Sequence, residues 1–183
     1  IKNKILIPAI NAMAQRGIPF KGILYAGLMI IGTDPYVVEF NVRFGDPETQ
    51  AILPRMKSDI VPLFLSCVNG TLDKCSIEYH DFACVTVVLA SGGYPGNYEK
   101  GKLITGIEEA EKDPNIVVFH AGTIEKDYKI FTNGGRVLNI TGWDSDLKKA
   151  TERVYSAIDK IYFEGMHYRK DIAKKGITRL TSL

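Results

Sequence analysis

The feature that most constrains this chain is a run of residues, 38–44, in which apolar and polar side chains alternate strictly. The apolar positions are Val38, Phe40, Val42 and Phe44, and the polar positions between them are Glu39, Asn41 and Arg43. Because a strand projects successive side chains to opposite faces, this period predicts a strand with one face fit for a core. The other face carries a carboxylate, a carboxamide and a guanidinium in a row.

The polar face admits two interpretations. Mg²⁺ is commonly held by one or two protein oxygens together with substrate phosphates, and arginine matches phosphate oxygens bidentately. Two oxygen donors beside a fixed cation therefore suit a magnesium–polyphosphate complex. An antiparallel strand with a solvated polar face produces the same alternation, so the pattern alone leaves both interpretations open.

Around this run the sequence predicts three helices and two paired strands. Residues 1–16 have helical spacing of apolar side chains. Strands are expected at 20–29 and 36–44, paired antiparallel across a turn at 32–35. A helix capped by Asp46, with Pro47 at its first position, should end or kink at Pro54, and another should run from Ser58 to Asn69-Gly70. The helix capped by Asp46 begins directly after the alternating run.

The second half indicates a small unit of strands and one long helix. Buried strands are expected at 83–90 and 116–119. Segments 128–131 and 136–140 flank Asn133-Gly134-Gly135, a strong hairpin signal. Ser145 is expected to cap the last long helix. The apolar set of this helix is Leu147, Ala150, Val154, Ala157, Ile158 and Ile161.

Composition limits the function classes. Hydrophobic residues make up 45% of the 183 residues and charged residues 24%, which is ordinary for a soluble globular protein. A net charge of +2 gives no case for nucleic-acid binding, and no apolar stretch suggests a membrane span. The cysteines, Cys67, Cys75 and Cys84, show no metal-ligand spacing, and we expect inert thiols in a reduced, cytoplasmic protein.

Several ordered segments together resemble one enzyme family. The run EFNVRFGDPETQ at 39–50 is preceded by GILYAGLM at 22–29 and followed by ASGGYPGNYEKG at 90–101. HAGT at 120–123, TNGGRVL at 132–138 and YRKDI at 168–172 complete the set. This sequence resembles the glycinamide ribonucleotide synthetases (phosphoribosylamine–glycine ligases) of the ATP-grasp superfamily, over about residues 5–176.

The resemblance implies an α+β fold. Residues 1–70 would be the C-terminal part of an ATP-grasp catalytic domain, built of antiparallel strands and helices. Residues 71–183 would form a small α+β domain with a β-hairpin and a C-terminal helix. The family's N-terminal half would precede residue 1, and it would be the partner that completes the enzyme.

The resemblance also assigns roles to the alternating strand. Glu39 and Asn41 would bind Mg²⁺ (or Mn²⁺) at the phosphates of ATP, the co-substrate. Arg43 would stabilise charge on the transferring phosphoryl group. Asp46 and Glu48 would orient the substrate amine, although capping of the following helix accounts for them equally well.

Glycine-rich loops are the expected substrate contacts. They comprise Gly93, Tyr94 and Pro95; His120, Gly122 and Thr123; and Gly134, Gly135 and Arg136. Backbone N–H groups at a glycine-rich turn plus one arginine can form a phosphomonoester site, so Arg136 is assigned to the 5′-phosphate of the sugar. The alternative is a tight turn with a solvated arginine.

The implied reaction joins glycine to 5-phosphoribosylamine at the expense of ATP, through a glycyl phosphate, in purine biosynthesis. Two alternatives remain. One is an ATP-grasp enzyme like biotin carboxylase, whose strand also resembles E-x-N-x-R but which lacks the GDPETQ continuation. The other is a non-catalytic binding or assembly fragment, because the nucleotide-binding half of the family should lie outside these residues.

Overall fold

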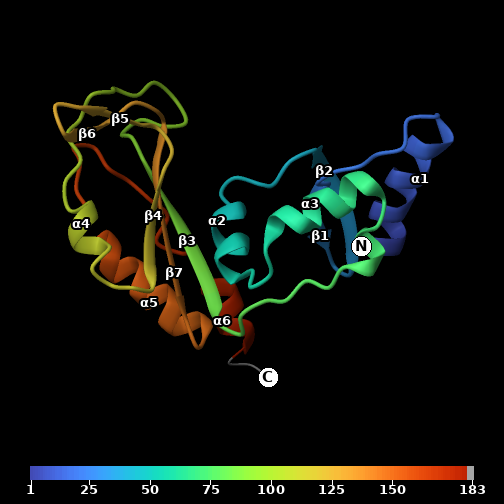
Figure 1. The fold of residues 1–183 in the computed structure, drawn as a ribbon. Coiled ribbons are helices and arrows are strands. Elements are labelled where there is room, and N and C mark those ends of the chain that lie inside the picture. Colours follow the sequence, from blue (N-terminus) through green and yellow to red (C-terminus); the bar gives the residue numbers. More distant parts are fainter. Residues whose placement is uncertain (181–183) are drawn as a thin grey trace. The chain divides into compact units, whose positions relative to one another are not determined.

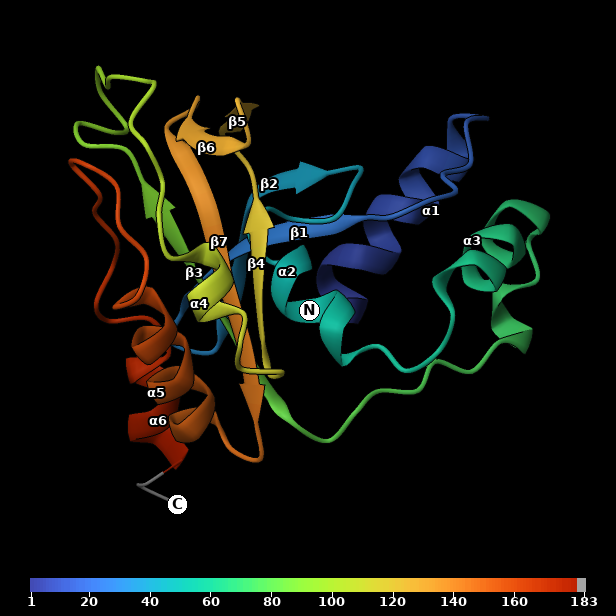
Figure 2. The ribbon, with the colours of Figure 1, turned by 60° about the vertical axis from the view of Figure 1, so that its left-hand side comes forward.

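The computed structural model describes residues 1–180 and divides them into two compact units (Figures 1 and 2). Unit 1 comprises Ile1–Asp46 and Lys57–Glu78, and unit 2 comprises Pro47–Met56 and the described residues from Tyr79 onward. Each unit combines helices with antiparallel strands, which confirms the α+β class. The domain boundary expected near residue 70 stays a prediction.

Unit 1 contains one two-stranded sheet and two helices. A π-helical turn, Lys2–Leu6, continues into α1 (Ile7–Gln15). The strands β1 (Tyr25–Ile31) and β2 (Asp34–Asn41) pair antiparallel, as predicted. Helix α3 (Ile60–Asn69) begins where the Asp59 side chain accepts a hydrogen bond from the Val61 N–H, and it ends at left-handed Gly70.

The expected apolar face of β2 is not buried by the described residues of unit 1. Val38 is 69% exposed, Phe40 45% and Val42 72%. The last member of the apolar set, Phe44, has an aromatic neighbour: its ring centroid lies 6.4 Å from that of Phe64. The prediction of a core-facing side is therefore wrong for unit 1 by itself.

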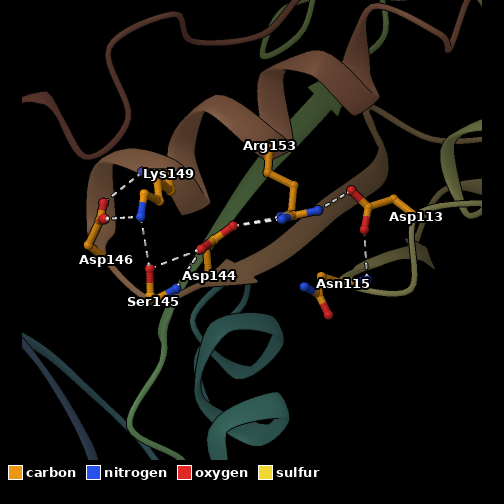
Figure 3. Close-up of polar contacts among 7 residues, drawn as sticks. All are labelled: Asp113, Asn115, Asp144, Ser145, Asp146, Lys149 and Arg153. Carbon is orange, nitrogen blue, oxygen red and sulfur yellow. Dashed lines mark hydrogen bonds and ion pairs between the residues drawn. The ribbon is translucent and has the colours of Figure 1, made fainter.

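Unit 2 is built on a three-stranded antiparallel sheet in the order β3-β7-β4. The strands are β3 (Ala83–Ala90), β4 (Ile116–His120) and β7 (Arg136–Asp144), the first two as predicted. Helix α5 (Leu147–Ile158) covers one face of the sheet, and the short α2 (Thr49–Ile52) packs on the other (Figures 1 and 3). The smaller helices are α4 (Ile107–Ala110) and α6 (Lys174–Leu180).

The core of unit 2 lies between the sheet and α5. Alternate residues of each strand point into it, and α5 contributes the apolar side chains that its spacing predicted. The fully buried members include Val87, Leu89, Leu138, Ile140, Val154, Ile158 and Phe163. Gly142 of β7 allows α5 to pack close to the sheet, because a Cβ at Gly142 would lie 2.9 Å from Val154 Cγ2.

The predicted hairpin between 128–131 and 136–140 is wrong. The hairpin of unit 2 joins β5 (Thr123–Lys126) to β6 (Lys129–Thr132), with Asp127 and Tyr128 at its tip, both at positive φ. The segment after Asn133-Gly134-Gly135 is β7, which pairs with β3 and β4 instead of β6. Strand β7 is the central strand of its sheet, and because its backbone groups pair with β3 at one edge and β4 at the other, no edge is left for β6.

One predicted helix cap is also corrected. Helix α2 begins at Thr49, and the capping of this helix by Asp46 stays a prediction. Helix α5 is capped by Asp146, whose Oδ1 accepts a hydrogen bond from the Lys149 N–H at 2.8 Å; Ser145 lies one residue too early. The predicted end at Pro54 is confirmed, because a 3-10 turn over Leu53–Arg55 follows α2.

A charged network fastens α5 to the sheet (Figure 3). Arg153 donates from Nη2 to Asp144 Oδ2 at 2.6 Å, and from Nη1 to Asp113 Oδ2. The hydrogen bond from Arg153 lowers the pKa of the Asp144 carboxyl. One guanidinium thus joins the helix to the end of β7 and to the segment before β4.

The three cysteines are unpaired, as expected. Burial raises the pKa of the Cys84 thiol to about 11, so this thiol stays protonated at neutral pH and has little nucleophilic character. Among residues 1–180, no helix has the length and apolar character needed to cross a membrane.

Candidate functional site

The first group of predicted site residues lies on β2 in unit 1. Asn41 Nδ2 donates a hydrogen bond to Glu39 Oε1 at 3.0 Å, so the two side chains share one face of the strand, as the alternation predicted. Glu39 is exposed and Asn41 half-buried. The pair presents a carboxylate and a carboxamide that touch each other and remain accessible.

Space for this pair comes from the neighbouring strand. Gly27 of β1 lies directly opposite Glu39, and the register shifts between Gly27 and Leu28. A Cβ at Gly27 would lie 3.0 Å from Glu39 Cγ, closer than real side chains tolerate without displacement. Glycine at this position therefore lets the Glu39 side chain lie across β1.

The third member of the expected row is separated from the strand. Strand β2 ends at Asn41, and Arg43 lies in the bend that follows, where its Nη1 donates to the Phe44 carbonyl oxygen at 2.7 Å. The prediction that the strand extends to residue 44 is wrong. The roles assigned to Arg43, Asp46 and Glu48 remain predictions; Glu48 belongs to unit 2, and Asp46 ends the first segment of unit 1.

The pair can supply part of a divalent-cation site. Carboxylate and carboxamide oxygens are ligands that Mg²⁺ accepts, and a Mg²⁺ ion usually keeps waters or substrate phosphates as its other ligands. The donor chemistry therefore fits, with Glu39 and the Asn41 amide oxygen as the protein ligands. In the described part of the chain, no three His, Cys, Asp or Glu side chains are grouped to hold a metal by themselves.

The second group of predicted residues meets at one end of the sheet in unit 2. The Ser91 N–H donates to the Gly135 carbonyl oxygen and Ser91 Oγ to that of Gly134, each at 2.8 Å. The rings of Tyr94 and Tyr98 cover Gly135, and a Cβ on Gly135 would overlap Tyr94. The loop after β3 is thus fastened over the glycine pair that precedes β7.

A third segment completes this cluster. The Gly122 N–H donates to the Arg136 carbonyl oxygen at 2.9 Å, and the Asn133 N–H donates to the Gly122 carbonyl oxygen at 2.7 Å. A Cβ at Gly122 would lie 2.6 Å from Gly134 Cα, so both residues must be small. Next to them, His120 Nδ1 and Thr123 Oγ1 are 3.0 Å apart.

The substrate-binding residues predicted from the three motifs therefore lie together, although the predicted hairpin does not exist. The strand β4 and the hairpin β5–β6 each end beside the start of β7, which brings the segments into contact. Pro95 follows Tyr94 in the covering loop through a cis peptide bond, and Arg136 is exposed beside the cluster. Sequence reasoning missed the roles of Ser91 and Tyr98; the position of Ser91 directly after an apolar run was the available signal.

The chain matches two domain models of one family. "Phosphoribosylglycinamide synthetase, ATP-grasp (A) domain" matches residues 1–49, and "Phosphoribosylglycinamide synthetase, C domain" matches residues 84–175. The described units thus contain segments of both domains.

Curated relatives and a solved structure agree with these matches. The phosphoribosylamine–glycine ligase of Caldanaerobacter subterraneus subsp. tengcongensis is 49% identical over 94% of this chain and 41% of its own length. The Synechocystis sp. ligase is 45% identical over 97% of this chain and 42% of its own. The trifunctional purine biosynthetic protein adenosine-3 of Gallus gallus is 47% identical over 99% of this chain and 18% of its own.

The crystal structure of phosphoribosylamine–glycine ligase from Thermotoga maritima superposes with a TM-score of 0.75 and 40% identity. The match covers 87% of this chain and 39% of that one. The chain accordingly spans about two fifths of the length of the single-function relatives named here. Because two domain models of the family match residues 1–49 and 84–175, and relatives match along almost the entire length, the chain belongs to the phosphoribosylglycinamide synthetase family.

Proposed function

We propose that this chain is the C-terminal part of a phosphoribosylamine–glycine ligase that acts in purine biosynthesis in the cytoplasm. Residues 1–70 would end the ATP-grasp domain and residues 71–183 would form the C-terminal domain. The observation that carries the proposal is the contact between Glu39 and Asn41, over the space that Gly27 leaves open. An enzyme like biotin carboxylase is disfavoured, because both matched domain models describe the synthetase.

The chemistry requires an activated carboxylate. A carboxylate is a poor electrophile, so ATP would first phosphorylate glycine to glycyl phosphate and release ADP. The amine of 5-phosphoribosylamine would then attack the acyl carbon and release phosphate. Because a free acyl phosphate is readily hydrolysed, both substrates have to be held in one closed site.

We assign the residues of this chain to two sites, one for the metal and the ATP phosphates and one for the sugar phosphate. Glu39 and Asn41 would hold Mg²⁺ or Mn²⁺ at the phosphates of ATP, where the ion supplies charge neutralisation. Arg43 would stabilise negative charge on the transferring phosphoryl group. Asp46 and Glu48 would orient the amine.

The glycine cluster of unit 2 would bind the sugar phosphate. Arg136 is exposed beside Gly134 and Gly135, and the loop that carries Gly93, Tyr94 and Pro95 covers the same glycines. A guanidinium next to close-packed backbone suits a phosphomonoester. His120, Gly122 and Thr123 would line the edge of this site.

We further propose that the rest of the ligase covers the apolar surface of unit 1. Met29, Ile31 and Val38 are each more than half exposed. A cavity of about 280 Å³ on the same unit has almost purely apolar walls, formed by Ala9, Ile10, Met13, Phe20, Leu24, Phe40 and Val42. Exposed apolar surface of this extent is typical of an interface, and the relatives have more than half their length outside the match.

Substitution of Glu39 tests the metal assignment. In the full-length ligase, Glu39→Ala should abolish ATP turnover at limiting Mg²⁺ without loss of the fold, because the side chain is exposed. The measurement is ligase activity as a function of Mg²⁺ concentration, with circular dichroism as the check on folding. Asp73→Asn, which neutralises another exposed carboxylate of unit 1, is the matched control and should keep normal turnover. Near-normal turnover of Glu39→Ala at limiting Mg²⁺ would exclude Glu39 as a ligand.

A further inference from the structure

A cavity of about 480 Å³ lies on one face of the β5–β6 hairpin, and none of the proposed functions above uses it. Its walls come from the hairpin and from the segment at 100–101, which runs beside β6: the Gly101 N–H donates to the Thr132 carbonyl oxygen at 2.7 Å. The lining residues are Lys100, Gly101, Ile124, Lys126, Asp127, Lys129, Phe131, Thr132 and Asn133. This volume is within the range of pockets for small molecules.

Two lysines of this cavity oppose each other directly. Lys126 of β5 and Lys129 of β6 are cross-strand partners in the register, so their side chains stand on the same face. Like charges at directly opposite positions destabilise a strand pair. Lys100 adds a third positive charge, and Asp127 is the one acid among the lining residues, so two positive charges are in excess.

These lysines differ from their neighbours in having no acidic partner. Lys102 pairs with Glu99 and Glu164, and Lys112 pairs with Glu109. Within the described part of the chain, Lys100, Lys126 and Lys129 form no ion pair and no side-chain hydrogen bond. An anion placed between them would supply the missing partner and relieve the repulsion of the opposed pair.

The floor of the cavity is apolar. Ile124 and Phe131 are cross-strand partners two positions along the hairpin, so they are the next pair on the face that carries the lysines. Ile124 is 37% exposed. A ligand that suits both parts of the surface combines charged oxygens with an uncharged portion that can rest on the two apolar side chains.

We propose that this cavity binds a small phosphate-bearing molecule, with its phosphate between Lys126, Lys129 and Lys100 and its uncharged portion over Ile124 and Phe131. Lysine is a common phosphate ligand because its ammonium acts as a point charge with several donors. Asn133 is shared with the glycine cluster beside Arg136, through its backbone N–H, but none of the three lysines belongs to that cluster or to the Glu39–Asn41 pair. The inference therefore stands independently of the proposed ligase reaction.

The test is titration of the full-length protein with inorganic pyrophosphate, followed by calorimetry. The variant Lys126→Gln/Lys129→Gln is compared with Lys112→Gln/Lys148→Gln, which removes the same charge from exposed positions of unit 2 outside the cavity. Other anion sites remain in both proteins, so the difference between the two isotherms reports the cavity alone. The cavity variant should lose one class of site or weaken it by about 10-fold or more, given the usual strength of charged hydrogen bonds.

A conservative variant distinguishes charge from folding. Lys129→Arg keeps the positive charge and should bind pyrophosphate nearly as well as the unaltered protein. Pyrophosphate should also raise the unfolding temperature of the unaltered protein more than that of Lys126→Gln/Lys129→Gln. Equal stoichiometry and affinity in the two double variants would overturn the proposal, and so would an equal loss of binding in Lys129→Arg.

Discussion

Arg136 stands at the first position of β7, directly after the glycine pair that Tyr94 and Tyr98 cover. Its backbone is already engaged, because its carbonyl oxygen accepts the Gly122 N–H. The Gly122 N–H is consequently not available to bind an anion, although the sequence predicted that N–H groups of the glycine-rich turns would do so. In the proposed phosphate site, the Arg136 guanidinium would be a donor that this backbone hydrogen bond leaves unused.

We predict that Arg136→Ala in the full-length ligase weakens binding of phosphoribosylamine selectively. A lost charge-assisted contact costs roughly 1.5–3 kcal/mol, so the apparent constant for phosphoribosylamine should rise about 10- to 150-fold. The constants for ATP and glycine should hardly change, and Arg136→Lys should recover part of the loss. Steady-state kinetics with each substrate varied in turn is the measurement. A fall in ATP affinity, or unfolding of the variant, would contradict the assignment.

Residue patterns forecast the pairing of Glu39 and Asn41 but not the position of Arg43. Alternation predicts on which face a side chain lies, but it does not say where the strand ends. Strand β2 ends at Asn41 because the described partner strand, β1, begins at Tyr25, the residue opposite Asn41. The end of a strand depends on its partner, which no single segment of sequence reveals.

Among the secondary-structure elements, helix α5 shows that the capping residue can differ from the predicted one by a single position. Asp144, Ser145 and Asp146 are consecutive, and each has a side-chain oxygen that could cap a helix. Asp146 does so, whereas the Asp144 carboxylate binds the Arg153 guanidinium. The helix and its buried face were predictable from spacing, but the capping residue depends on the tertiary ion pair that engages its neighbour.

The two candidate caps can be compared directly. Asp146→Ala should lower the free energy of unfolding by about 1 kcal/mol, because the Lys149 N–H loses its acceptor at the first turn. Ser145→Ala is the matched control and should cost clearly less, since the hydrogen bonds of its side chain are long, at 3.2 and 3.4 Å. Urea denaturation of both variants is the measurement. An equal or larger loss in Ser145→Ala would contradict the assignment of Asp146 as the cap.

The β5–β6 hairpin shows that a turn sequence alone does not identify which strands pair. Asn133-Gly134-Gly135 is a strong turn sequence, yet the strands on its two sides join different sheets. The true hairpin turns at Asp127-Tyr128, where two non-glycine residues adopt positive φ. The glycines near residue 134 serve close contact with Gly122 instead, a requirement that arises only from the tertiary fold.

For the whole molecule, the two units differ in how completely they bury their apolar residues. Unit 2 has a closed core under α5, and its strands β3 and β4 were predicted almost to the residue. In unit 1, Val38 and Val42 of the alternating run are exposed. Binary patterning identifies a face that must be covered, but it does not identify the segment that covers it.

We predict that the 183-residue chain by itself is inactive and binds Mg-ATP weakly. The family's purine pocket and phosphate-covering loop would come largely from the part of the ligase outside this chain. Calorimetric titration of the chain with Mg-ATP should give no binding in the low micromolar range, which corresponds to about −8 kcal/mol. The full-length ligase, titrated in parallel, should bind. Low-micromolar binding by the chain alone would mean that its nucleotide pocket is complete.

The order of strands in the sheet of unit 2 has a consequence for synthesis of the protein in the cell. Both β3 and β4 pair only with β7 in this sheet, and β7 is the last of the three to leave the ribosome. Until then, β3 has no partner strand, and its valines and Leu89 are open to chaperones or to neighbouring nascent chains. Slow translation before β7 should therefore prolong the interval in which this domain is vulnerable to aggregation.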